Sequence, residues 1–364
     1  MSIVMTGGGT GGHLAIIRAV KEQLATHQNS QRIKDSRSES HQNASLLTPH
    51  SSLIYIGSLR GQDRQWFEGD DDFEATYFLE TRGVVNQGMF GKIASIWMLT
   101  KATVRTIRLL RKHRAKVVFS VGGYSAAATA FAAKLLRIPL VIHEQNAALG
   151  SLNKLLKPYA DVFLSSYEEN SPVKAYPVQQ VFFDTARVRE RVETVIFLGG
   201  SQGAQAINAL ALSLAPELHK RGITILHQAG ERHLETVRQA YGDLGIEAEV
   251  FGFTTELPVL MTRADLAIAR AGASTLWELA ANGLPTLFVP YPYAASDHQY
   301  YNAKFLVDQD AAWVMREDAL EPDAVLPLLA ASELPEMSRK LMALSDPEGA
   351  RQIAALLEQY VHVV

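Results

Sequence analysis

The sequence predicts an α/β protein built from two Rossmann-like domains, each with a parallel sheet. Short apolar runs rich in β-branched residues alternate with helix-like segments along the chain, which is typical of strands buried on both faces of such a sheet. The pattern strand, glycine loop, helix start occurs twice, as MTGGGTGGH at residues 5–13 and FLGGSQGAQ at residues 197–205. A chain of 364 residues is also long enough for two domains of ordinary size.

The expected strands fall into two groups. In the first half, strands are expected at residues 2–6, 53–57, 116–123, 139–145 and 161–165, with a helix from about His13. In the second half, strands are expected at residues 194–200, 223–230, 248–253, 265–272 and 285–290. Each run is short and is followed by turn residues or a helix-like segment, so the doubly wound pattern holds in both halves.

A proline within KAYPVQQVFF interrupts the alternation and marks the domain boundary. We place the first domain at residues 1–177 and the second at residues 178–346. Residues 347–364, which follow Asp346-Pro347, are expected to form a final helix. Residues 27–50 are polar and low in complexity, so they are expected to be a solvated insertion.

The composition is that of a globular protein from a reducing compartment. The chain is 47% hydrophobic and 20% charged, so it can bury two cores. It contains no cysteine, which excludes disulfides and thiolate metal sites. No apolar run approaches the roughly 20 residues of a spanning helix, and Met1 leads directly into the first strand. We therefore expect a soluble protein of the cytoplasm.

The charge is unevenly distributed. No acidic residue occurs from Thr81 to His143, while 11 Lys and Arg residues do, in a chain of net charge −3. Within this region, residues 88–116 have helical apolar spacing. The simpler interpretation is an amphipathic helix packed on its sheet. The interpretation that we favour adds a patch around Met89, Phe90, Ile93 and Trp97 that rests on an anionic membrane surface.

Both glycine loops are expected to face ligands, because a strand-loop-helix turn directs backbone N–H groups at one point and phosphate fits there. The first loop satisfies the dinucleotide pattern G-x-G-x-x-G with Gly7, Gly9 and Gly12. An NAD site would also need an acidic residue at the end of the second strand. That strand ends in Gly57-Ser58, so the expected carboxylate is missing.

A further anion site is expected at ARAGASTLWELAANGLP, residues 269–285. Gly272 and Ala273 stand at a helix start, and Glu278 lies one turn in, where it can accept both hydroxyls of a ribose. Thr275-x-x-Glu278 also fits a capping box, and the spacing does not decide between the two roles.

These motifs together resemble the bacterial MurG glycosyltransferases. The matching pieces are GGGTGGH, VGGYSAAATAFAAKLLRIPLVIHEQNAALGSLNKLL, FLGGSQGAQAIN, HQAG, ADLAIARAGASTLWELAANGLPTLFVPYPYAASDHQYYNA and AAW. They follow the family's order, and the resemblance spans most of the chain from residue 1 to about 316. The resemblance implies a GT-B fold, in which two Rossmann-like domains face a cleft. It also implies that the first domain holds the acceptor, the second holds the UDP-sugar, and the final helix returns to the first.

The activity that the resemblance implies is inverting transfer of N-acetylglucosamine from UDP-N-acetylglucosamine. The acceptor would be the 4-hydroxyl of undecaprenyl-pyrophosphoryl-N-acetylmuramoyl-pentapeptide, in peptidoglycan synthesis. The enzyme would act at the cytoplasmic face of the inner membrane as a peripheral protein. We expect an anionic membrane surface as a partner, no nucleic acid, and no cofactor. Asp70-Asp71-Asp72 lies in an expected loop rather than at a strand end, so we expect no obligatory metal.

The resemblance also implies substrate-binding residues. In chain order these are Thr10, Gly11, Gly12, Asn146, Ser201, Phe253, Ala273, Ser274, Thr275, Leu276, Trp277, Glu278 and Gln299. Glu278 would bind the ribose, Phe253 the uracil through its backbone, and Gln299 the sugar hydroxyls. Tyr124 and Asn208 lie on matched glycine motifs and are expected to line the site.

The sequence departs from the family pattern before its second domain. The family usually has NPVR there and this chain has YPVQ, so Gln179 stands where an arginine would contact the donor. Arg187 is a possible substitute.

Two residues are candidates for the general base that the displacement needs. His13 is preferred, because the positive end of a helix favours the neutral imidazole. Glu144 is the other candidate, with a structural carboxylate that holds the HEQN turn as its alternative role. The rival functions for such a chain are a nicotinamide dehydrogenase, a UDP-N-acetylglucosamine epimerase and a non-catalytic nucleotide-binding scaffold.

Overall fold

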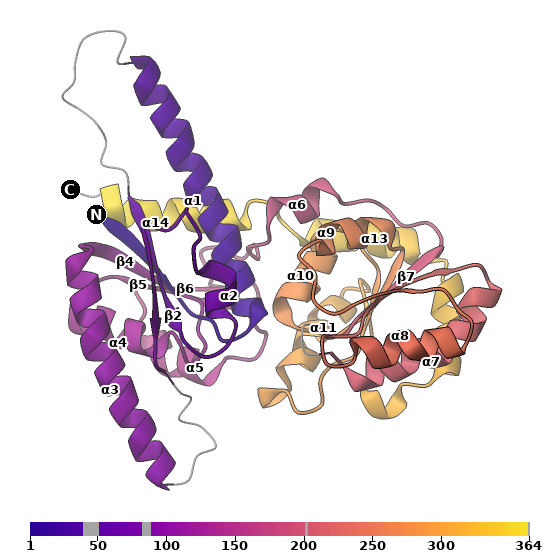
Figure 1. Cartoon of the computed structure of the whole chain (residues 1–364). Coiled ribbons are helices and arrows are strands. Elements are labelled where there is room, and N and C mark those ends of the chain that lie inside the picture. Colours follow the sequence, from indigo (N-terminus) through magenta and orange to yellow (C-terminus); the bar gives the residue numbers. More distant parts are fainter. Residues whose placement is uncertain (39–50, 82–88, 201–202, 363–364) are drawn as a thin grey trace. The chain divides into compact units, whose positions relative to one another are not determined.

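The structure is a computed structural model that describes residues 1–38, 51–81, 89–200 and 203–362 (Figure 1). It divides into two compact units. Unit 1 comprises residues 1–145, 149–179 and 348–364, and unit 2 comprises residues 146–148 and 180–347. The two units are described separately below.

Unit 1 is built on a six-stranded sheet whose paired strands are all parallel. The spatial order of its strands is β3 (Ala75–Leu79), β2 (Ser52–Ser58), β1 (Ser2–Thr6), β4 (Ala115–Ser120), β5 (Leu140–Glu144) and β6 (Val162–Ser165). Its helices are α1 (Gly11–Ser38), α2 (Asp63–Phe67), α3 (Met89–Lys112), α4 (Ala127–Leu135), α5 (Ser151–Leu156), η1 (Lys157–Tyr159) and α14 (Gly349–His362). The order 3-2-1-4-5-6 is that of the doubly wound dinucleotide-binding fold.

Unit 2 repeats this topology. The spatial order of its parallel strands is β12 (Trp313–Val314), β11 (Thr286–Phe288), β10 (Leu266–Ala269), β7 (Thr194–Leu198), β8 (Thr224–Gln228) and β9 (Glu249–Phe251). Its α-helices are α6 (Gln180–Asp184), α7 (Gln205–Lys220), α8 (Leu234–Asp243), α9 (Leu257–Arg263), α10 (Ala273–Ala281), α11 (His298–Val307), α12 (Pro322–Val325) and α13 (Leu334–Leu344). Its 3-10 helices are η2 (Ala295–Asp297), η3 (Glu317–Ala319) and η4 (Leu326–Ala330).

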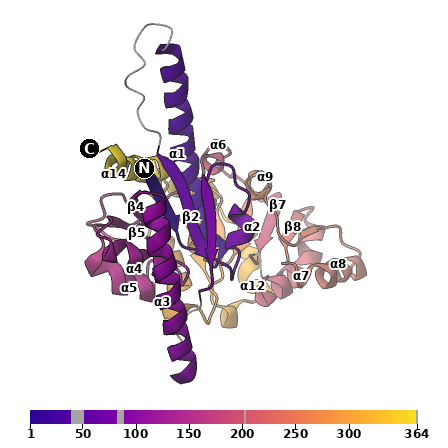
Figure 2. The ribbon, with the colours of Figure 1, turned by 60° about the vertical axis from the view of Figure 1, so that its left-hand side comes forward.

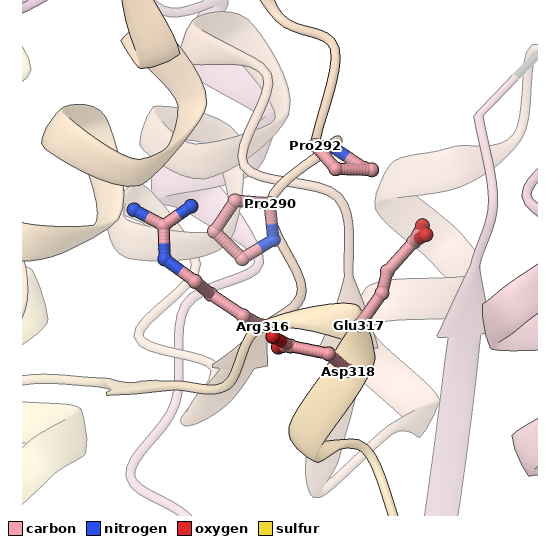
Figure 3. A pocket seen from close by; sticks show the side chains of 5 residues that line it. All are labelled: Pro290, Pro292, Arg316, Glu317 and Asp318. Atoms are coloured by element: carbon pink, nitrogen blue, oxygen red, sulfur yellow. The ribbon is translucent and has the colours of Figure 1, made fainter.

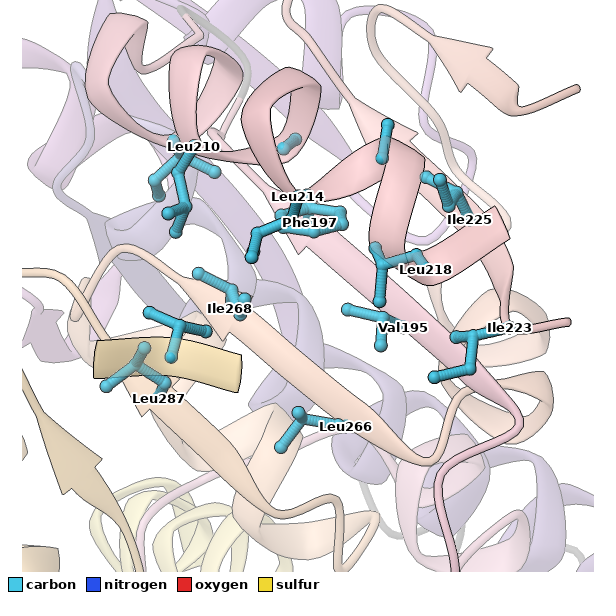
Figure 4. Packing of buried hydrophobic residues seen from close by; sticks show 14 of the residues in the cluster. Val195, Phe197, Leu210, Leu214, Leu218, Ile223, Ile225, Leu266, Ile268 and Leu287 are labelled. Carbon is cyan, nitrogen blue, oxygen red and sulfur yellow. The ribbon is translucent and has the colours of Figure 1, made fainter. Parts of the chain in front are cut away.

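The core of unit 2 shows why the apolar runs fold this way. Leu210, Leu214 and Leu218 recur at helical spacing and place one face of α7 on the sheet (Figure 4). They meet Val195 and Phe197 of β7, all with at most 3% of their surface exposed. Helices cover the sheet, so its strands are buried and lack polar alternation.

The predicted α/β fold with two parallel sheets is confirmed, and the edge strands β3 and β12 are additions to it. Both are short, and β3 is only half-buried over most of its length, so neither has the strong apolar signal of a central strand. The polar segment 27–50 differs from the prediction, because α1 continues through Ser38. No glycine or proline occurs between His13 and Thr48 to end the helix earlier. Residues 39–50 lie outside the described residues.

The last helix, α14, belongs to unit 1 and contacts α1 and β4. Its first residue, Gly349, packs closely on the backbone of residues 175 and 176. A Cβ added there would lie 2.7 Å from the carbonyl oxygens of Ala175 and Tyr176. His27 Nδ1 of α1 lies 2.8 Å from a carboxylate oxygen of Glu358. These contacts tie the end of the chain to the unit that holds its beginning.

The long helix α3 packs beside α4, and Figure 2 shows it running along unit 1. Its covered face is formed by Ala102, Thr106 and Leu110. Ile96 and Trp97 are instead exposed, by 55% and 70%. The helix is thus packed on unit 1 as an amphipathic element, but Ile96 and Trp97 contribute little to that packing. The side chains of Met89, Phe90 and Ile93 lie outside the described part of the chain.

Candidate active site

The first glycine loop, residues 7–12, follows β1 and leads into α1. Gly7 and Gly9 have φ angles of 129° and 88°, which a residue with a Cβ rarely adopts. The loop is held from behind by Asp63, whose side chain is fully buried. Asp63 Oδ2 accepts a hydrogen bond from Gly9 N at 2.7 Å, and Oδ1 accepts one from Ser58 N at 2.8 Å.

Tyr55 completes this support. Its hydroxyl lies 2.8 Å from the Gly7 carbonyl oxygen and 3.0 Å from Asp63 Oδ1. Burial raises the pKa of Tyr55 well above its usual value, and the neighbouring Asp63 raises it further, so the hydroxyl keeps its proton. Nothing in the sequence spacing indicated this role for Asp63, which lies five residues beyond the end of β2.

This arrangement bears directly on the dinucleotide alternative. A carboxylate does stand at the end of β2, but it comes from α2 and is buried. Both of its oxygens accept bonds from protein donors, so it is not free to hold a ribose. The Gly9 N–H points to this carboxylate and is likewise unavailable to a pyrophosphate.

His13 lies in the first turn of α1 and is half-buried. Its Nδ1 is 2.9 Å from Thr10 Oγ1, and its Nε2 is 2.9 Å from Gln145 Nε2. With the Gln145 amide as donor, Nε2 is the acceptor and Nδ1 carries the proton that is donated to Thr10. The ring is then a neutral imidazole whose basic nitrogen faces Gln145.

Tyr124 borders the same loop. A Cβ added to Gly9 would lie 2.8 Å from the Tyr124 ring. The Tyr124 hydroxyl donates a hydrogen bond to the carbonyl oxygen of Arg60 at 3.0 Å. Burial raises the pKa of Tyr124. Thr10, Gly11, Gly12, His13 and Tyr124 are thus brought together at the carboxyl end of the unit 1 sheet.

Glu144 is buried at the end of β5. Its Oε2 accepts hydrogen bonds from Gly150 N at 2.9 Å and from Asn153 Nδ2 at 3.0 Å. This is the geometry of a carboxylate that anchors the turn after β5. Burial of the neighbouring His143, together with the nearby His13, lowers the pKa of His143 to about 3, so it is neutral at physiological pH.

Asn146 belongs to unit 2 with the two residues that follow it. Its Oδ1 accepts a hydrogen bond from Asn302 Nδ2 at 3.1 Å, and Asn302 Oδ1 accepts one from Ala147 N at 2.8 Å. Asn302 is fully buried in α11 and also donates to the carbonyl oxygen of Ala271. No sequence pattern predicted this role for Asn302, although it lies in the matched DHQYYNA motif.

Neither candidate for the missing family arginine is free in this structure. Gln179 donates to Glu22 at 2.6 Å within unit 1. Arg187 is held by the carbonyl oxygens of Thr262 and Ala264 and by Asp265, at 2.6 to 2.9 Å. These contacts give Arg187 a structural role in unit 2.

The acidic run at residues 70–72 has a structural partner. Lys21 Nζ lies 2.7 Å from both Asp70 Oδ2 and Asp72 Oδ2, and the lysine side chain is 8% exposed. These carboxylates therefore fix the loop after α2 to α1.

The second glycine loop, residues 199–204, leads into α7, and Ser201 within it lies outside the described residues. Asn208, expected to line the site, is buried instead. It lies 3.0 Å from His227 Nε2 and donates to the Ala229 carbonyl oxygen, while His227 Nδ1 lies 3.0 Å from the Tyr241 hydroxyl. The network holds the start of α7 against β8. Burial lowers the pKa of His227 to about 4.

The start of helix α10 excludes a capping box formed by Thr275 and Glu278. Its N-cap residue is Gly272, without a side-chain cap, so Thr275 lies inside the helix and cannot form that box. Leu276 and Trp277 point into the core, where Trp277 packs on Phe305. Ala273 and Ser274 are also buried, whereas Thr275 and Glu278 are half-buried on the remaining face of the helix.

Phe253 and Gln299 each form a hydrogen bond within unit 2. Phe253 N donates to Glu231 Oε1 at 2.7 Å, and Gln299 Oε1 accepts from Tyr291 N at 2.9 Å. A ligand that bonds to the Phe253 amide must displace Glu231.

A pocket of about 450 Å³ lies in unit 2, next to residues 290–292 (Figure 3). It is lined by Pro290, Pro292, Arg316, Glu317 and Asp318. Arg270 forms an ion pair with Glu317 at this point, and Arg316 pairs with Asp297 at 2.6 Å. Asp297 precedes α11 with a φ of 51°, a left-handed conformation that the pairing helps to hold.

Comparison with known proteins assigns the chain to a family. Models of the glycosyltransferase family 28 N-terminal and C-terminal domains match residues 45–165 and 194–357. A protein of a Sulfurovum species, named UDP-N-acetylglucosamine–N-acetylmuramyl-(pentapeptide) pyrophosphoryl-undecaprenol N-acetylglucosamine transferase, is 62% identical over 99% of both chains. The chain belongs to the MurG glycosyltransferase family.

Other members agree with this assignment. The MurG-type transferase of Sulfurimonas denitrificans is 49% identical over 97% of each chain. The crystal structure of Acinetobacter baumannii MurG is 27% identical, covers 98% of this chain and 99% of its own, and has a TM-score of 0.72. A putative UDP-N-acetylglucosamine 2-epimerase from Listeria monocytogenes, at 11% identity and a TM-score of 0.60, shares the fold alone. The expected family, GT-B fold and glycosyltransferase activity are confirmed.

Proposed function

We propose that this MurG-family enzyme transfers N-acetylglucosamine from UDP-N-acetylglucosamine to undecaprenyl-pyrophosphoryl-N-acetylmuramoyl-pentapeptide. The observation that carries the proposal is the 62% identity, over 99% of both chains, to a protein named for this activity. The 4-hydroxyl of the muramoyl sugar attacks the anomeric carbon, the bond from that carbon to UDP breaks, and the configuration inverts. The hydroxyl loses a proton, and UDP leaves with the bonding electrons.

His13 is the proposed general base. As a neutral imidazole it can take the proton at Nε2, while Nδ1–H stays bonded to Thr10. Gln145 occupies Nε2 here, so the acceptor hydroxyl would replace the Gln145 amide at that nitrogen. Glu144 is the second candidate, but its bonds to Gly150 and Asn153 favour a role in holding the turn after β5.

Unit 2 is proposed to bind the donor. The N-terminal turn of α10 directs backbone N–H groups and a positive dipole end toward the proposed position of the diphosphate, which becomes more negative as UDP leaves. Glu278, half-buried on that helix, would accept the ribose hydroxyls, and Gln299 would contact the sugar. Ser201 and the backbone of Phe253 are also proposed to contact the donor, because they match donor-binding positions of the MurG family.

Unit 1 is proposed to rest on an anionic membrane surface. The exposed apolar side chains of Ile96, Trp97 and Val104 on α3 form what we call the apolar patch. Lys101, Arg105 and Arg108 on the same helix are also exposed. Basic residues at the rim of an apolar surface suit a lipid interface.

This surface supports a peripheral enzyme at the cytoplasmic face of the membrane, where a lipid-linked acceptor would be presented. None of the helices in the described part of the chain is long and apolar enough to cross a membrane. We propose no nucleic acid among the partners.

Replacing His13 with alanine tests the assignment of the base. We expect kcat for acceptor-dependent UDP release to fall about 10²- to 10⁴-fold, the usual contribution of a general base. The dissociation constant of UDP-N-acetylglucosamine, measured by calorimetry, should stay unchanged, because the proposed donor contacts lie in unit 2. His219→Ala, at an exposed position on α7, is the matched control and should leave both values unchanged. An H13A enzyme with near-normal turnover would exclude His13 as the base.

A further inference from the structure

The geometry points to Asp63 as a positioning residue for the Thr10–His13 pair, an inference that rests on the proposed role of His13. The side chain of Asp63 has no exposed surface, so it is not available to a substrate. Its effect would pass through the glycine loop that it holds. The contacts form a continuous chain from Asp63 to Gly9, then through the next peptide to Thr10, and from the Thr10 hydroxyl to His13 Nδ1.

The closeness of the packing supports this role. An added Cβ on Gly8 would lie 2.4 Å from Asp63 Oδ1, and one on Gly57 would lie 2.6 Å from the same atom. On the outer side of the loop, a Cβ on Gly61 would lie 2.7 Å from Gly9 Cα. The loop is therefore fixed between the buried carboxylate and the segment after β2. Such a support keeps a catalytic group in place, because small displacements of reacting groups are costly.

The hydrogen bonding identifies the property of Asp63 that matters. Each carboxylate oxygen accepts a backbone N–H, one from Gly9 and one from Ser58. An asparagine of the same size offers only one oxygen, so in either orientation its NH₂ group would face one of these N–H donors. Asp63→Asn thus changes the loop with almost no change in volume.

The expected result for D63N is a fall in kcat of at least about tenfold, with the KM for UDP-N-acetylglucosamine unchanged within about twofold. Tyr55→Phe removes only the hydroxyl that lies between Gly7 and Asp63 and should lower kcat by about two- to fivefold. Asp71→Asn, at an exposed position of the same unit, makes the same charge change and should leave kcat unchanged.

A double-mutant cycle separates positioning from general structural damage. If Asp63 acts through His13, adding D63N to H13A should lower kcat by less than about twofold further. Multiplicative losses, or a folded D63N enzyme with wild-type kcat, would overturn the inference. If D63N does not fold, Y55F decides in its place, and an unchanged kcat for Y55F would overturn it.

The two claims fail in different ways. A wild-type chain without acceptor-dependent transfer contradicts the proposed function. An active wild type with an inactive H13A variant but a normal D63N variant contradicts only the positioning role.

Discussion

Replacing Trp97 with serine should weaken binding to anionic lipid vesicles by about 30-fold. The side chain is 70% exposed, which for a tryptophan of about 250 Å² leaves about 175 Å² available to a lipid interface. At about 25 cal/mol per Å², full burial would contribute about 4 kcal/mol. A side chain immersed to about half its exposed area contributes about 2 kcal/mol, which corresponds to the stated factor.

The assay is co-sedimentation of the full chain with vesicles that contain anionic lipid, compared with zwitterionic vesicles. Tyr293→Ser is the matched control, because Tyr293 is an aromatic residue of unit 2 that is 82% exposed and lies outside the apolar patch. It should bind as the wild type does. Higher ionic strength should weaken the wild type through screening of the basic rim. W97S binding with wild-type affinity would refute the membrane role of α3.

Three further predictions concern stability and the loop. Burial lowers the pKa of His227 from 6.5 to about 4, so only the unfolded chain takes up a proton as the pH falls between these values. The free energy of unfolding of unit 2 should then fall by up to about 3 kcal/mol over that range, and H227Q should flatten the pH dependence measured by urea denaturation. Arg189→Met should cost more than about 3 kcal/mol in the same assay, since buried Arg189 donates to the carbonyl oxygens of Met261, Ala264 and Asn282, and unchanged stability would contradict this. Gly8→Ala should destabilise unit 1 by about 1–3 kcal/mol through its contact with Asp63, and a wild-type melting temperature would count against the packing described.

The sequence predicted the sheets well because their strands are buried on both faces and read as continuous apolar runs. It also located both glycine loops, because positions that need a left-handed backbone, such as Gly9, are occupied by glycine. The edge strands β3 and β12 were missed because short, partly exposed strands carry little apolar signal. The length of α1 was missed because a polar segment without glycine or proline can continue a helix.

The candidate site was less predictable wherever it depends on contacts between distant residues. Asp63 reaches Gly9 across 54 positions in the chain, and no local pattern reports such a contact. Asn208 was expected to line the site, and nothing in the sequence indicated its bonds to His227 and Ala229 within unit 2. Spacing alone left Glu278 between ribose binding and capping, and only the helix start at Gly272 excluded the capping box.

The exposure of the apolar patch could not be predicted from the helical spacing of α3. Helical spacing predicted that α3 is amphipathic, but it did not show which apolar residues face the sheet. The side of α3 that packs on the unit combines small residues and threonines such as Ala102 and Thr106 with Leu110. The large side chains of Ile96 and Trp97 point outward, which the spacing could not indicate.

The most direct test of the central claim is a transfer assay with the full chain, UDP-N-acetylglucosamine and a purified undecaprenyl-pyrophosphoryl-N-acetylmuramoyl-pentapeptide. We predict UDP release that requires the acceptor, with one UDP formed for each disaccharide product, and its loss in the H13A variant. Absence of acceptor-dependent UDP release from the wild-type chain would contradict the claim.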